Sequence, residues 1–131
     1  MMGDANWNEK RIIDVVHSLI TTYQWTVLPA EKLATLVANA MRLEDPPDDL
    51  NRFVIARYTI ELYNACRQAD DLELRERGYT DLFHYVYRAA YQKWPDLAED
   101  ATQRALLLVY QQIERCANPV AFRSFALFKL R

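Results

Sequence analysis

Residues that break helices are scarce in this chain, and their positions constrain its fold more than any other feature. There are two glycines, Gly3 and Gly78, in 131 residues, and five prolines at positions 29, 46, 47, 95 and 119. A β-sandwich or barrel needs turn residues roughly every 8 to 12 positions, and most gaps here are longer. Apolar residues recur at a spacing of about 3.6 rather than 2. The sequence therefore predicts an all-α protein, a compact bundle of about six helices.

Capping residues and breakers give the expected bounds of these helices. Asn6 followed by Glu9 has the form of a capping box, and Asp48 or Asp49 can cap the third helix. Gly78 suits the position just past a helix end, so we expect a helix to close there and the next to begin at Thr80. The six predicted helices start near residues 7, 29, 50, 80, 96 and 119.

Composition narrows the class of protein. Hydrophobic residues make up 51% of the chain and the formal net charge is −2, which excludes a disordered tail and a strongly basic, autonomous nucleic-acid binder. Cys66 and Cys116 have no partner at metal-binding or redox spacing, which favours two reduced core thiols over a disulfide. No stretch has the pattern of a signal peptide or a membrane span. We therefore expect a cytoplasmic protein with no membrane contact, metal or cofactor.

Charge is distributed unevenly along the chain. Residues 1–78 contain 9 basic and 13 acidic side chains, whereas 79–131 contain 7 and 5. From Arg115 onward there are four basic residues and no acidic one. A locally basic end can contact phosphates even when the whole chain is not basic. We therefore expect an N-terminal helical segment of unknown role, 1–78, and a helical module, 79–131, packed in one globule.

Three consecutive sequence segments from Tyr79 onward give the clearest indication of function. An aromatic helix, YTDLFHYVYRAAYQKW, is followed by LAEDATQRALLLVY and then by NPVAFRSFALFKLR. This order resembles region 2 of the sigma-70 family of RNA polymerase sigma factors, especially the extracytoplasmic-function type. The most specific match is Glu99, Asp100 and Gln103 at the family's AED-x-x-Q spacing, with Phe122 and Arg123 downstream. The resemblance covers residues 79–131.

The resemblance implies a transcription initiation factor domain that binds RNA polymerase core enzyme and takes part in promoter recognition and melting. Glu99, Asp100, Gln103 and Leu107 would contact the clamp coiled coil of the β′ subunit. On a helix, Asp100, Gln103 and Leu107 share one strip, and a strip of this composition suits a partner helix pair. The family also has anti-sigma factors as partners.

The same resemblance assigns the last helix to promoter DNA, through Arg123, Phe125, Lys129 and Arg131. Phenylalanines at a spacing of three, Phe122, Phe125 and Phe128, can stack on unpaired bases or belong to the core. The chain departs from the family: Phe125 replaces a tryptophan, Lys129 replaces an aliphatic residue, and no helix-turn-helix domain follows. Either a fragment of a longer sigma factor or a stand-alone relative fits this pattern.

Two other classes of function remain open. An all-helical regulatory adaptor or anti-sigma-like protein would bind another protein without reading DNA, because helical faces look the same whichever chain covers them. An enzyme is disfavoured, since His17 and His84 have no metal-binding spacing and no nucleophile elbow or phosphate loop is present. Asp81 and His84 could form an oriented base, but this spacing is more often a surface hydrogen bond. We expect a binding protein and no enzymatic activity.

Overall fold

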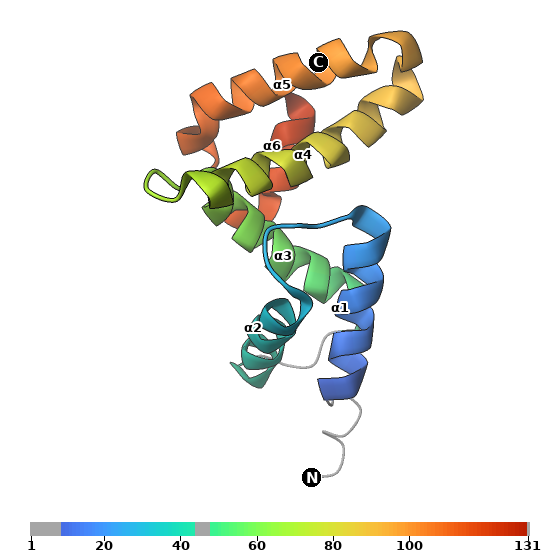
Figure 1. Cartoon of the computed structure of the whole chain (residues 1–131), viewed down its shortest axis with the longest axis vertical. Helices are drawn as coiled ribbons and strands as arrows, with labels where there is room; N and C mark the ends of the chain where they lie inside the picture. Colours follow the sequence, from blue (N-terminus) through green and yellow to red (C-terminus); the bar gives the residue numbers. More distant parts are fainter. Residues whose placement is uncertain (1–8, 44–47, 131) are drawn as a thin grey trace. The chain divides into compact units, whose positions relative to one another are not determined.

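The computed structural model describes residues 9–43 and 48–130, and every regular element within them is helical (Figure 1). The predicted all-α class is confirmed. Asn6 and Arg131, assigned to a helix cap and to DNA, lie outside the described residues. The α-helices are α1 (Glu9–Tyr23), α2 (Ala30–Leu43), α3 (Leu50–Cys66), α4 (Leu72–Lys93), α5 (Ala98–Gln112) and α6 (Phe122–Phe128). Single 3₁₀ turns cover Pro95–Leu97, Ile113–Arg115 and Pro119–Ala121.

The chain divides into two compact units, and the boundary falls between Tyr58 and Thr59, inside α3. The first unit is built from α1, α2 and the first half of α3, and the second from the rest of α3 with α4, α5 and α6. This boundary does not coincide with residue 78, where we expected the N-terminal segment to end.

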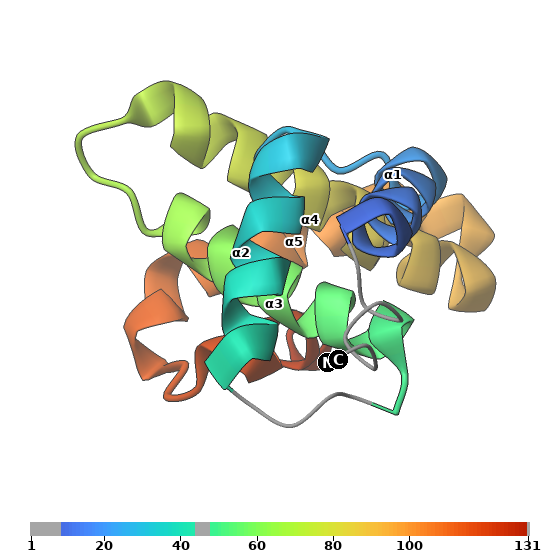
Figure 2. The ribbon, with the colours of Figure 1, turned by 90° about the horizontal axis from the view of Figure 1, so that it is seen from below.

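In the first unit α1 and α2 pack against each other (Figure 2). Gln24 has a left-handed backbone, with φ of 58°, and the N–H of Trp25 donates to the carbonyl of Ile20 at 3.2 Å. This is the Schellman pattern that ends a helix. Trp25 then stacks on Tyr58 with 3.7 Å between ring centroids, and both rings are buried. The end of α1 is therefore fixed both by its own backbone and by an aromatic pair.

In the second unit α4 and α5 lie side by side and run in opposite directions, and α6 packs on both (Figure 1). The turn between α4 and α5 begins at Pro95, as predicted. Asn118 caps the turn before α6, since its side-chain oxygen accepts from the N–H of Val120 at 3.1 Å. The fully buried apolar residues on these helices include Leu82, Val86, Ala90, Ala105, Val109, Phe122 and Ala126.

The expected helix boundary at Gly78 is wrong. Helix α4 begins at Leu72, where Asp71 caps it by accepting the N–H of Leu74 at 3.0 Å, and it continues through Gly78. Gly78 is buried against the end of α3, and a Cβ placed there would lie 3.1 Å from the Cβ of Ala65 and from the Sγ of Cys66. The glycine thus permits a close approach of two helices instead of ending one.

We expect Gly78→Ala to lower the free energy of unfolding by about 1 kcal/mol, although alanine is the better helix former. The added methyl group must displace Ala65 or Cys66, and overpacking of this kind costs about 1 to 3 kcal/mol against a propensity gain near 1. Urea unfolding followed by circular dichroism measures the change. The exposed Thr80 provides the control, since Thr80→Ala should change stability by less than about 0.5 kcal/mol. A more stable Gly78→Ala protein would contradict the assignment.

Candidate functional site

Helix α5 has one buried and one exposed face. Its buried residues are Ala98, Thr102, Ala105 and Val109. The four residues assigned to the polymerase contact, Glu99, Asp100, Gln103 and Leu107, are all exposed. We call these four residues the α5 strip. Because α5 is held along its length by α4, the strip is presented on a helix whose position is fixed.

The C-terminal end of the α5 strip is apolar and exposed to solvent. Leu107 is 55% exposed, and Tyr110, one turn further along, is 58% exposed. Large exposed apolar side chains that cluster on one face mark sites where another molecule binds. Tyr110 was not among the expected site residues, although its spacing of three from Leu107 would have placed it on the same face.

Tyr110 adjoins a second tyrosine whose hydroxyl is buried. The rings of Tyr79 and Tyr110 lie 6.3 Å apart, and the Tyr79 hydroxyl oxygen has no hydrogen-bond partner among the described residues. Burial raises the pKa of the Tyr79 phenol, and the Cys66 thiol adds to the effect. This hydroxyl therefore stays protonated and able to donate at neutral pH.

The two acids at the start of α5 have a structural role as well. Glu99 and Asp100 lie in the first turn of the helix, and no side chain caps the N-terminus at Leu97. Carboxylates in this position offset the partial positive charge of the first turn, which stabilises a helix by about 0.3 to 1 kcal/mol each. Helix electrostatics alone can therefore explain why acids occupy these two positions, whether or not they also contact a partner.

Two of the residues assigned to DNA, Arg123 and Lys129, contact neutral groups of their own unit. The guanidinium of Arg123 lies 3.9 Å from the ring centroid of Tyr85, on α4. Lys129 donates to the side-chain oxygen of Gln112 at 2.8 Å, and its ammonium lies 4.6 Å from the ring centroid of Phe125. Arg123, Phe125 and Lys129 are each half-buried. Tyr85 and Gln112 were not predicted, because only tertiary packing brings them to α6.

The three phenylalanines of the last segment separate into three environments. Phe122 is fully buried, with its ring edge-on to Tyr63 at 5.3 Å, so of the two alternatives it belongs to the core. Phe125 stacks beside Phe122 at 6.3 Å and is half-buried. Phe128 is 64% exposed. Of the three, Phe128 presents the most ring surface to an incoming molecule.

The residues considered for catalysis, Asp81, His84 and the two cysteines, have the following environments. Asp81 is buried, while the half-buried ring of His84 lies edge-on to Phe83 at 6.2 Å. Cys66 and Cys116 are free and buried, as expected of core thiols, and burial raises the pKa of both. These thiols therefore remain protonated and weakly nucleophilic. Across the described ranges, no three His, Cys, Asp or Glu side chains come together in a way that could hold a metal ion.

No helix in the part of the chain that the structure describes is both long and apolar enough to cross a membrane.

Comparison of the chain with family models, with curated proteins and with solved structures found no match. The candidate site has two features: the exposed α5 strip with Tyr110, and the cations Arg123, in α6, and Lys129, directly after it.

We expect Arg123 and Tyr85 to stabilise the second unit as a pair. Cation–π contacts of this kind contribute about 0.5 to 1 kcal/mol, so Arg123→Met and Tyr85→Leu should show a coupling energy of that size in a double-mutant cycle. Urea unfolding of the four proteins measures it. Arg115→Met, at an exposed arginine near the same end of the chain, should show no coupling to Tyr85→Leu. Equal coupling in both cycles would mean that the cation–π contact contributes nothing specific.

Proposed function

We propose that residues 79–131 form a sigma region 2-like module of a transcription initiation factor, which binds RNA polymerase core enzyme and takes part in promoter recognition and melting. The observation that carries this proposal is the exposure of Glu99, Asp100, Gln103 and Leu107 on one side of α5. These residues match the spacing of the sigma family's AED-x-x-Q helix, and a contact surface must be accessible. The proposed place of action is the cytoplasm, where the polymerase is found.

The proposed partner of the α5 strip is the clamp coiled coil of the polymerase β′ subunit. A carboxylate and an amide give register and direction to such a contact, whereas Leu107 and Tyr110 supply apolar area. Tyrosine is among the residues most often found at the energetic centre of protein interfaces. An anti-sigma factor that covers the same strip would block polymerase binding.

The proposed DNA contact is made by α6. Arg123 and Lys129 contact neutral groups, an aromatic ring and an amide, so these contacts leave their positive charge uncancelled. Phe125 and the exposed Phe128 lie on the same short helix. Positive charge beside aromatic rings is the combination that binds unpaired nucleotides without strict sequence preference. Such a surface is suited to holding a melted strand.

We expect Asp100→Lys combined with Gln103→Ala to weaken capture of polymerase core enzyme by about 2 kcal/mol or more, which is roughly thirtyfold. The first substitution replaces a carboxylate that would attract the polymerase surface by an ammonium that would repel it. The second removes an amide from the centre of the strip. Binding of purified core enzyme to the immobilised chain measures the change. The matched control is Glu76→Lys with Gln92→Ala, which makes the same charge change at exposed positions of α4. Unchanged capture by the α5 variant would remove the assignment.

We expect the chain alone to bind single-stranded promoter DNA weakly, with an affinity that falls steeply as salt rises. Each phosphate neutralised on a single strand contributes about 0.7 to the slope of log K against log salt. Arg123→Ala and Lys129→Ala should each lower that slope by about this amount, whereas Lys32→Ala, at an exposed position of α2, should not. Fluorescence anisotropy at several salt concentrations measures the slope. Salt-insensitive binding, or tight binding to duplex alone, would contradict the proposal.

A helical adaptor that binds another protein without DNA is the second candidate. The observation that favours it is the half-buried position of Arg123, Phe125 and Lys129, each in contact with other groups of the second unit. The two predictions above separate the candidates. An adaptor would show no salt-dependent binding to single-stranded DNA, with or without a polymerase contact through the α5 strip.

A further inference from the structure

One face of α2 carries a regular pattern and is only partly covered by its own unit. Leu33 and Val37 are fully buried and face the interior. On the other side of the helix, successive spacings of three, one, three, one and three place six residues along one face. We call them the α2 face: Glu31, Ala34, Thr35, Ala38, Asn39 and Arg42.

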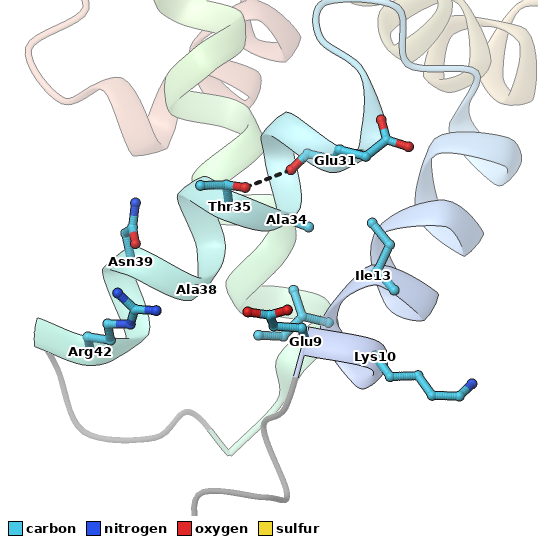
Figure 3. A pocket seen from close by; sticks show the side chains of 10 residues that line it. Glu9, Lys10, Ile13, Glu31, Ala34, Thr35, Ala38, Asn39 and Arg42 are labelled. Carbon is cyan, nitrogen blue, oxygen red and sulfur yellow. Dashed lines mark hydrogen bonds between the residues drawn. The ribbon is translucent and has the colours of Figure 1, made fainter.

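A groove of about 500 Å³ runs between the α2 face and α1 (Figure 3). Ile12 and Ile13 line its α1 side, and Ala34 points toward Ile13. Ile13, Ala34 and Ala38 are each half-buried, so apolar surface at the floor of the groove is still in contact with water. A groove of this shape is what a further helix fills when it packs against a helix pair.

The chemistry of the α2 face changes in order along its length. Glu31 lies in the first turn and Arg42 in the last, so the two ends carry opposite charges. Between them, two alanines alternate with Thr35 and Asn39, and the Thr35 hydroxyl donates to the carbonyl of Glu31 at 3.0 Å. Small residues in the middle allow another helix axis to come close, while the charged ends select its direction.

This pattern is complementary to itself. When two copies of the α2 face run in opposite directions, with a two-fold axis between positions 36 and 37, Glu31 of each copy meets Arg42 of the other. In the same register Ala34 meets Asn39 and Thr35 meets Ala38, so each small residue meets a larger polar one. The contact extends over about 17 Å at the rise of an α-helix. A shift of one turn or a parallel arrangement breaks both charge pairs.

We infer that the α2 face is a homodimer interface, and that its occupant is a second copy of this chain related by a two-fold axis. An interface of this type uses the same patch on both partners, so the patch must be self-complementary in charge and in size. The α2 face meets both conditions. The inference concerns the first unit and goes beyond the proposed function of residues 79–131.

The test is the dimer dissociation constant of the full chain, measured by sedimentation equilibrium. Glu31→Lys alone and Arg42→Glu alone should each weaken the dimer about tenfold or more, because each replaces two attractive pairs by two repulsive ones. An equimolar mixture of these two variants should associate as tightly as the native chain, since all facing charges in the mixed dimer are then opposite. The double variant should also recover dimerisation.

Lys32→Glu is the matched control, because this exposed residue of α2 meets Met41 in the proposed register and no charge. It should leave the dissociation constant unchanged, and circular dichroism should show the same helix content in every variant. A chain that sediments as a monomer up to about 100 μM would overturn the inference. Failure of the mixture to restore binding would overturn it too, because the face would then take a different partner.

A second measurement is independent of charge. Thr35→Cys combined with Ala38→Cys places two thiols opposite those of the partner copy, so mild oxidation should give a disulfide-linked dimer on a non-reducing gel. The native thiols do not interfere, because Cys66 and Cys116 are buried. Thr35→Cys combined with Lys32→Cys leaves no cysteine opposite another in this register, so it should crosslink little. Equal crosslinking of the two variants would argue against the register.

Discussion

The close approach of α3 and α4 at Gly78 is the constraint on which the second unit depends. A Cβ at this position would lie only 3.1 Å from Ala65 and Cys66, so glycine lets α4 run unbroken from Leu72 to Lys93 close beside the end of α3. An unbroken α4 offers one long apolar side, and α5 and α6 both pack on it. Because α5 packs on α4 through its apolar side, its polar side faces the solvent. The exposure of the α5 strip is thus a consequence of a contact made elsewhere in the unit.

Much of the fold could be predicted because its signals are local. Asp49 accepts the N–H of Arg52 at 3.2 Å, and Asn118 caps the turn before α6; a capping side chain acts within three residues of its own position. The exposed strip followed from helical spacing on α5. These signals need no knowledge of where the rest of the chain lies, so the sequence alone could predict them, although the cap expected at Thr80 lies inside α4.

The features that could not be predicted depend on contacts between distant segments. A glycine that ends a helix and one that lets two helices touch look the same in a sequence, and only the position of Cys66 separates them at Gly78. Three phenylalanines at a spacing of three rotate gradually around a helix, so Phe122 enters the core while Phe128 faces water. Nor could the pairing of Arg123 with Tyr85 be foreseen, because no periodicity connects α6 to α4.

The contacts of Arg123 and Lys129 bear on the proposed DNA contact. Where a phosphate replaces the ring or the amide as the partner of a cation, the lost contact offsets part of the attraction. In the proposed function, this exchange would lower the affinity of the isolated chain for a single strand. The proposed contact would then form mainly where the polymerase already holds the strand next to α6.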